Sequence, residues 1–197
     1  MRTTPAPRRP AGFTLVEMLA TVALLVILLG LSVSLARHVR ERSAQAVTTD
    51  LLRRLDALAT RYAAGHGNAP PAVAPFPPPE ATANARVGPD APIAMEAPQA
   101  DRQLLLRAAL NNNRDVVAAL RAGLGKDDRD LAELPVSISD GTHVRDAWGS
   151  PVVFMPQKHP WVGTAPRDKS YFFFSAGPDR DYLTRGDNLY SYEAARE

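Results

Sequence analysis

The feature that most constrains this chain is an apolar run from Phe13 to Ala36 that contains one ionisable group, Glu17. At 1.5 Å per residue, a helix over this run would reach about 36 Å, enough to cross a bilayer core with some tilt. A carboxyl group in hydrocarbon costs roughly 2.5–3.5 kcal/mol on insertion scales, so Glu17 should have a partner. The run therefore predicts a transmembrane helix over residues 13–36 that does more than anchor the chain.

The start of this run contains a candidate cutting point. Gly12 directly precedes the new hydrophobic start, so a cut there would remove residues 1–12 as a short leader. Two alternatives stay open. A secretory signal peptide is one, because residues 32–36 (Ser-Val-Ser-Leu-Ala) look like a small-residue cleavage site, although the run is long for such a peptide. A plain single-pass anchor is the other, and it leaves Glu17 unexplained. Arginines flank both ends, so orientation is only weakly signalled.

Residues 12–17 (Gly-Phe-Thr-Leu-Val-Glu) resemble the processing site of type IV pilins and of type II secretion pseudopilins. The resemblance implies that a prepilin peptidase cuts on the cytoplasmic side, between Gly12 and Phe13, and methylates the new amine of Phe13. It also implies that Glu17 meets the terminal amine of a neighbouring subunit during assembly. This pairing is physically reasonable, because an unpaired ion in lipid is costly and a pair formed only in the filament favours assembly.

After the membrane segment, the helix is expected to continue over residues 37–64. Positions at intervals of three and four form the stripe of an amphipathic helix, which we expect to pack against a soluble domain. The stripe comprises Val39, Ser43, Val47, Leu51, Leu55, Leu58 and Tyr62. The cluster Gly65-His66-Gly67-Asn68 should end the helix. Residues 65–100 are rich in proline and alanine, which predicts an extended linker or ordered loop.

Residues 101–197 predict a globular part that is helical first and then β. Asp101 is typical of a helix cap, and Asn111-Asn112-Asn113 interrupts the following apolar pattern, which favours two short helices with a joint. Alternation predicts a short strand over 135–139, with clearer strands over 152–155 and 171–175. The fold class is therefore α+β and pilin-like: a long N-terminal helix packed on a small C-terminal antiparallel sheet.

The segment Asp146-Ala147-Trp148-Gly149-Ser150-Pro151 resembles the Asp-x-Trp-Gly-x-Pro segment of major pseudopilins. The residue types fit a turn, in which Asp146 caps, Gly149 takes an unusual dihedral and Trp148 fills the gap between sheet and helix. We expect Trp148 and the run Phe172–Phe174 to be core residues, with an outward-facing phenylalanine available for subunit contact.

An acidic loop over residues 175–190 resembles the calcium-binding loop near the end of major pseudopilins. Calcium takes six to eight oxygen ligands, and the candidates here are Asp179, Asp181, Asp187 and Asn188. The loop departs from the family pattern, because it contains Arg180 and Arg185 and lacks the glycine-rich middle. A polar loop whose aspartates cap turns or pair with these arginines therefore stays open.

Composition and the lack of catalytic motifs narrow the classes of function that we expect. There are no cysteines, and removing the three leader arginines takes the formal charge from +2 to −1, so nucleic-acid binding is poorly supported. The four histidines lack the spacing of a zinc site, and no nucleophile or phosphate-loop signature occurs, so we expect no enzyme.

Two classes of function remain. The first is a structural subunit that polymerises with other pilin-like subunits on an inner-membrane secretion platform, with its C-terminal domain in the periplasm. The second is a minor pilin-like module for DNA uptake or adhesion. For that class the candidate charges are Arg102, Arg107, Arg114 and Arg121, which only loosely share a helix face.

Overall fold

The computed structural model describes residues 14–77, 102–125, 129–156, 158–159, 163–164, 170–184 and 186–193. Contacts divide it into two compact units, Met1–Arg40 and Glu41–Glu197. The predicted leader with Gly12 and Phe13, the cap at Asp101 and the proline-rich residues 78–101 lie outside the described residues.

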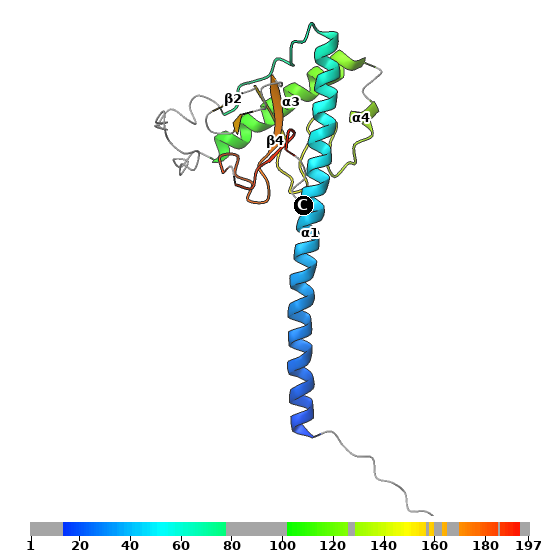
Figure 1. The fold of residues 1–197 in the computed structure, drawn as a ribbon, viewed down its shortest axis with the longest axis vertical. Helices are drawn as coiled ribbons and strands as arrows, with labels where there is room; N and C mark the ends of the chain where they lie inside the picture. Colours follow the sequence, from blue (N-terminus) through cyan, green and yellow to red (C-terminus); the bar gives the residue numbers. More distant parts are fainter. Residues whose placement is uncertain are drawn as a thin grey trace, which may run out of the picture. The chain divides into compact units, whose positions relative to one another are not determined.

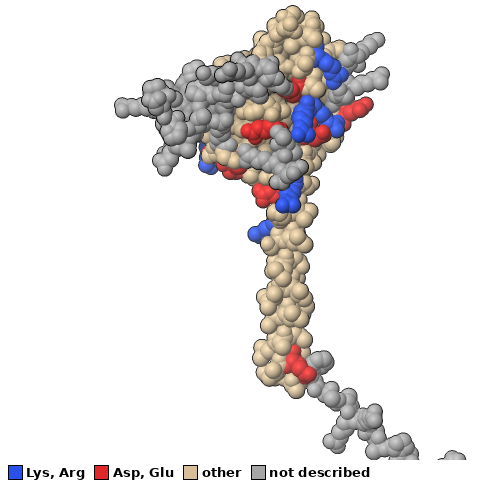
Figure 2. All heavy atoms as spheres, in the orientation of Figure 1, with Lys and Arg blue, Asp and Glu red and all other residues tan. Residues whose placement is uncertain are grey.

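Helix α1 (Leu15–Gly65) confirms the predicted long N-terminal helix (Figure 1). In the first unit its side chains are exposed throughout. Residues 14–36 contain no basic residue, and Figure 2 shows a single acidic group near the start of the helix. Among the described residues, α1 is long and apolar enough to cross a membrane, which is compatible with single-pass anchoring.

The end of α1 follows from two residues with left-handed backbone. Gly67 and Asn68 have φ angles of 66° and 63°, and the Asn68 amide donates to the Ala63 carbonyl at 2.8 Å. Glycine and asparagine tolerate this conformation, and the bond satisfies a carbonyl that the helix end would otherwise leave open. The predicted stop at residues 65–68 is thereby confirmed.

Burial of α1 begins only at Thr48. From there Leu51, Leu55 and Leu58 of the predicted stripe are buried, as the second unit packs around them. The earlier stripe positions, Val39, Ser43 and Val47, are exposed in the subunit. The amphipathic pattern was therefore read correctly for its second half, whereas its first half has no partner within the described residues.

The main sheet is antiparallel, with the order β1-β4-β5, where β1 is Val153–Pro156, β4 is Tyr171–Ser175 and β5 is Leu189–Tyr190. Strands β2 (Lys158–His159) and β3 (Gly163–Thr164) form a separate two-stranded sheet. The short helix α4 covers Arg129–Ala132. The clear predicted strands are thus confirmed, and the fold class α+β is shown.

Both faces of the main sheet are covered. Side chains alternate across a strand, so Phe154 and Phe173 join α1 in one hydrophobic cluster, whereas Phe172 and Phe174 join the other cluster with Phe76. All three phenylalanines of β4 are fully buried. The expected outward-facing phenylalanine was therefore wrong, because residues on both sides of β4 cover the strand.

Helix α3 (Arg102–Leu124) is continuous through Asn111–Asn113, so the predicted joint was wrong. Asn112 is 1% exposed, and its side chain bonds both backbone groups of Phe154: the Phe154 amide donates to Oδ1 at 2.8 Å, and Nδ2 donates to the Phe154 carbonyl at 3.0 Å. Strand β1 is an edge of the main sheet, so the Asn112 amide satisfies groups on its open side.

Asn113 makes the same kind of contact one residue further along α3. Its Oδ1 accepts from the Val144 amide at 2.8 Å, and its Nδ2 donates to the Val144 carbonyl at 2.9 Å and the Val152 carbonyl at 2.5 Å. The two asparagines interrupt the apolar pattern because they bond to backbone in the core. We call Asn112 and Asn113 the asparagine clamp.

Two further predictions were wrong. Residues 136–138 form a turn, and only Ser139 makes an isolated bridge, to Val144. Val136 is 91% exposed, so the alternation did not reflect a buried strand face. Trp148 is half-buried and belongs to neither hydrophobic cluster. The gap between the helices and the sheet is instead filled by aliphatic side chains such as Leu120 and Val144.

Candidate functional site

The start of α1 is a capping box formed by Thr14 and Glu17. The Thr14 backbone amide and hydroxyl both donate to Glu17 Oε2 at 2.9 Å, and the Glu17 amide donates to Thr14 Oγ1 at 3.2 Å. This reciprocal arrangement satisfies two amides that a helix start leaves open. The pattern Thr-x-x-Glu was present in the sequence, and reading it as a cap would have found this contact.

The capping box leaves half of the carboxylate available. Both hydrogen bonds to the carboxylate use Oε2, and Oε1 has no partner among the residues that the structure describes. Two other polar side chains of the run bond within the helix: the Thr21 hydroxyl donates to the Glu17 carbonyl, and the Ser32 hydroxyl donates to the Leu28 carbonyl. Glu17 is the one ionisable residue in residues 14–36, and its Oε1 has unused capacity to bind a cation.

In the acidic loop, three oxygens surround the Thr184 hydroxyl. Thr184 Oγ1 lies 2.5 Å from Asp179 Oδ2, 3.4 Å from Asp187 Oδ1 and 3.0 Å from the Asp181 carbonyl oxygen. The Asp179 amide also donates to Asp187 Oδ2 at 3.3 Å. Two carboxylates, a hydroxyl and a carbonyl are hard oxygen ligands of the kind that calcium takes.

Electrostatics in this loop also favour a cation. The pKa of Asp187 is raised, first by partial burial and then by the negative charge of Asp179 beside it. Asn188 is fully buried, and its Oδ1 accepts no hydrogen bond within the described part of the chain. A cation between the two carboxylates would relieve their repulsion. The chemistry of these oxygens is therefore compatible with a calcium ion.

The third predicted carboxylate lies apart from this group. Asp181 Oδ1 accepts from the Leu183 amide at 3.1 Å, and Oδ2 lies 3.6 Å from an Arg102 nitrogen. Asp181 contributes its carbonyl rather than its side chain to the oxygen group. Consistent with this, the described residues contain no cluster of three or more acidic or histidine side chains arranged for a metal.

The Asp146 turn is connected by hydrogen bonds to the start of the acidic loop. Asp146 Oδ1 accepts from the Trp148 and Ser150 amides at 3.0 and 2.8 Å, which confirms its predicted capping role. Its Oδ2 accepts from the Ser175 hydroxyl at 2.6 Å, and Ser175 Oγ in turn accepts from the Gly177 amide at 3.0 Å. Burial raises the pKa of Asp146, against the lowering effect of these bonds.

The arginines of α3 do not form a free basic stripe. Arg121 donates to the Gly141 carbonyl, Arg114 lies 3.5 Å from Asp115, and Arg102 lies 3.6 Å from Asp181. Three of the four candidate guanidinium groups therefore already have a contact: two lie near an aspartate, and the third donates to a backbone carbonyl. The arrangement gives little support to nucleic-acid binding along this helix.

Comparison with known proteins supports the family. A model described as the prokaryotic N-terminal methylation motif matches residues 7–33, which include Gly12, Phe13 and Glu17. Comparisons with curated proteins and with solved structures each found no match. The motif, the long helix that follows it and the small antiparallel sheet together support a pilin-like protein, similar to the type IV pilins and pseudopilins. The motif implies processing by a prepilin peptidase and pilin-like assembly.

Proposed function

We propose that this chain is a structural subunit of the pseudopilus of a type II secretion system. In this proposal the peptidase cuts between Gly12 and Phe13 and methylates the Phe13 amine. The subunit then stays in the inner membrane through α1, with the second unit in the periplasm, until an assembly platform adds it to a filament. The chain has no catalytic role of its own. The observation that supports this most is the methylation motif at the start of a helix whose apolar surface is exposed.

The capping box defines how Glu17 would act before and during assembly. Before assembly, the two hydrogen bonds from Thr14 to Oε2 reduce the cost of holding a carboxylate in hydrocarbon. Oε1 remains open to the methylated amine of a neighbouring subunit. An ion pair formed in a low-dielectric surrounding is strong when both partners are also hydrogen-bonded, so the pair would favour the assembled state.

The variant Glu17→Val tests this role. It keeps the helix apolar, so we expect normal insertion and normal cleavage but at least a tenfold loss of filament cross-links, because about 1.4 kcal/mol per subunit corresponds to tenfold. Ser32→Ala is the matched control, since it removes a polar group of the same helix that bonds the Leu28 carbonyl within that helix. Cross-links at the normal level in Glu17→Val would contradict the pairing.

We also propose that the acidic loop binds calcium through Asp179, Asp187, the Thr184 hydroxyl and the Asp181 carbonyl, with Asn188 next to them. Bound calcium would neutralise the two facing carboxylates and join the two ends of the loop. This cross-link would take the place of a disulfide in a chain that has no cysteine.

Melting the full chain in detergent micelles with calcium and with chelator tests the metal. At a calcium concentration about 100 times Kd, binding stabilises by about 2.7 kcal/mol, which should raise the melting midpoint by roughly 5–10 °C. Asp187→Asn should abolish this rise. Asp50→Asn should keep it, because Asp50 pairs with Arg54 on α1 and lies outside the loop. An unchanged wild-type midpoint would remove calcium from the proposal.

A further inference from the structure

Three arginines follow directly after the membrane-length run of α1. They are Arg37, Arg40 and Arg42. Residues 37–42 contain one acidic residue, Glu41, so with His38 neutral the formal charge of this segment is 3 − 1 = +2. All six residues are exposed, and Figure 2 shows a basic side chain where the uncharged stretch of α1 ends. The apolar run therefore ends in a segment with a net positive charge.

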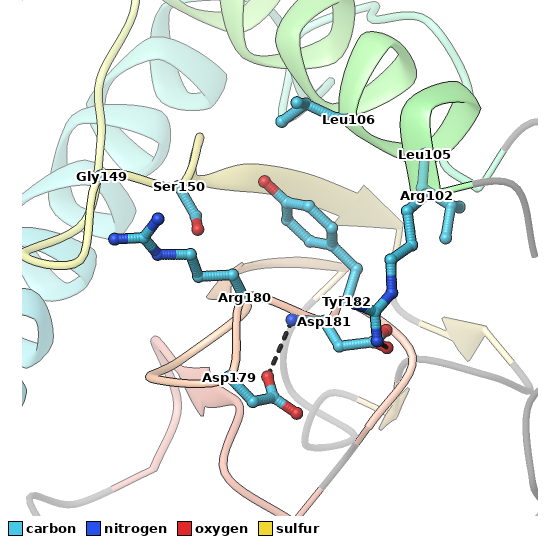
Figure 3. A pocket seen from close by; sticks show the side chains of 9 residues that line it. All are labelled: Arg102, Leu105, Leu106, Gly149, Ser150, Asp179, Arg180, Asp181 and Tyr182. Atoms are coloured by element: carbon cyan, nitrogen blue, oxygen red, sulfur yellow. Dashed lines mark hydrogen bonds and ion pairs between the residues drawn. The ribbon is translucent and has the colours of Figure 1, made fainter.

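Arg37 and Arg40 have no partner among the residues that the structure describes. Neither makes a hydrogen bond or an ion pair there, and neither does Glu41. An arginine of the second unit shows the contrast: Arg102 lies beside Asp181 (Figure 3), with a nitrogen 3.6 Å from the carboxylate. The charges of Arg37 and Arg40 are thus not neutralised within the described part of the chain.

Arg37 and Arg40 also share one face of α1. Residues three apart on a helix are neighbours, with about 5–6 Å between their Cβ atoms. Within the first unit, residues 14–40 contain one acidic residue, Glu17, at the opposite end of the run. Each guanidinium can donate two parallel hydrogen bonds to a phosphate, so the pair can hold one phosphate group or two adjacent ones.

The length of the apolar run places these two arginines at a defined level of a bilayer. From Leu15 to Ala36 the helix rises about 32 Å, close to the roughly 30 Å of a hydrocarbon core. Arg37 and Arg40 follow about 2 and 6 Å beyond Ala36, and each headgroup layer is about 5–7 Å thick. When α1 spans a bilayer, both guanidinium groups therefore lie in the layer of lipid phosphates.

We propose that Arg37 and Arg40 together bind the phosphate of an anionic phospholipid headgroup. An anionic headgroup is favoured over a zwitterionic one, because the latter carries its own cation next to the phosphate. The proposal requires α1 to span a membrane, as the proposed function does, but it requires neither cleavage, nor assembly, nor calcium. In the proposed mature chain, which lacks residues 1–12 and their arginines, this contact holds the basic end of the span.

Native mass spectrometry of the full chain tests the proposal. The chain is placed in nanodiscs with equal amounts of phosphatidylglycerol and phosphatidylcholine, and the lipids that remain bound after release are counted. We expect phosphatidylglycerol adducts to exceed phosphatidylcholine adducts at least fivefold, since about 1 kcal/mol per arginine near an anionic surface corresponds to roughly fivefold. Equal adducts would overturn the proposal, as would displacement of phosphatidylglycerol by millimolar inorganic phosphate, which would indicate a site for free phosphate.

The double variant Arg37→Gln, Arg40→Gln removes the two guanidinium groups. Circular dichroism should show unchanged helix content, because neither side chain bonds to a described residue. We expect the ratio of the two adducts to fall to about one. The matched control is Arg53→Gln, Arg54→Gln, which removes two charges from exposed residues of α1 in the second unit and should keep the wild-type ratio. A preference retained in the first variant, or an equal loss in the control, would overturn the proposal.

Flotation with vesicles after carbonate extraction tests the spanning helix separately. We expect the wild type and the variant Arg37→Gln, Arg40→Gln both to float, because the apolar run is intact in each. Flotation of the wild type without a preference for phosphatidylglycerol would overturn the headgroup contact alone. A wild-type chain that does not float would overturn the proposed function as well.

Discussion

Replacing Asn112 by alanine should destabilise the second unit far more than the same change at Asn111. Asn112 is 1% exposed and bonds the Phe154 amide, the Phe154 carbonyl and the Ala74 carbonyl, so its loss strands backbone groups away from water. Each buried unsatisfied group costs about 1–3 kcal/mol, and carbonyls tolerate this better than amides. We expect a total loss of about 2–4 kcal/mol in the free energy of unfolding.

Asn111 provides a control in the same turn of α3. It is exposed, and alanine is the better helix former by up to about 0.7 kcal/mol, so Asn111→Ala should be neutral or slightly stabilising. For a unit of this size the loss at Asn112 corresponds to a melting midpoint lowered by roughly 4–16 °C. Circular dichroism of the full chain in micelles measures both variants. If the two midpoints agree, Asn112 does not hold the edge of the sheet.

Three further predictions concern packing, pH and the helix start. Gly123→Ala should lower the free energy of unfolding by about 1–3 kcal/mol, because an added Cβ would lie 2.3 Å from the Tyr62 ring. Asp146→Asn should remove a pH dependence of the free energy of unfolding. Because the pKa of Asp146 is raised in the folded state, its contribution to stability is complete below its unfolded pKa and is lost as pH rises through its folded pKa. Thr14→Val should speed hydrogen exchange of the first α1 amides about fivefold, since a lost cap costs about 1 kcal/mol.

Each of these has its own control. Gly65→Ala meets no atom within 4 Å, so denaturant melting should show no loss there, and an equal loss would contradict the steric argument. For Asp146, denaturation of both proteins at several pH values should show the wild type losing its advantage toward neutral pH; parallel curves would contradict the burial effect. Thr14→Ser keeps the hydroxyl, so it should exchange like the wild type.

The sequence predicted those parts of the fold that depend on local patterns. The apolar run, the stop at Gly67 and Asn68 and the strands of the main sheet follow from hydrophobicity, backbone preference and alternation. The asparagine clamp could not be found this way. An asparagine that bonds core backbone looks the same in sequence as one that breaks a helix, and only the position of β1 beside α3 decides between them.

The candidate sites show the same contrast between what a local sequence pattern indicates and what only tertiary contacts decide. Glu17 was singled out because a lone acid in an apolar run is conspicuous, but its bond to Thr14 was missed, although the capping pattern was visible. In the acidic loop, composition identified Asp179 and Asp187, whereas the contact of Asp181 with Arg102 depends on the start of α3 lying beside the loop. Thr184 carries no charge, and its place among the loop oxygens arises only from the turn.

The intact mass of the protein extracted from membranes tests the account most directly. Glu17 can find a terminal amine on a neighbouring subunit only if that amine has been released in the first place. We predict a chain that begins at Phe13 and carries one added methyl group. A mass that still includes residues 1–12, or one that corresponds to a cut after Ala36, would contradict the account.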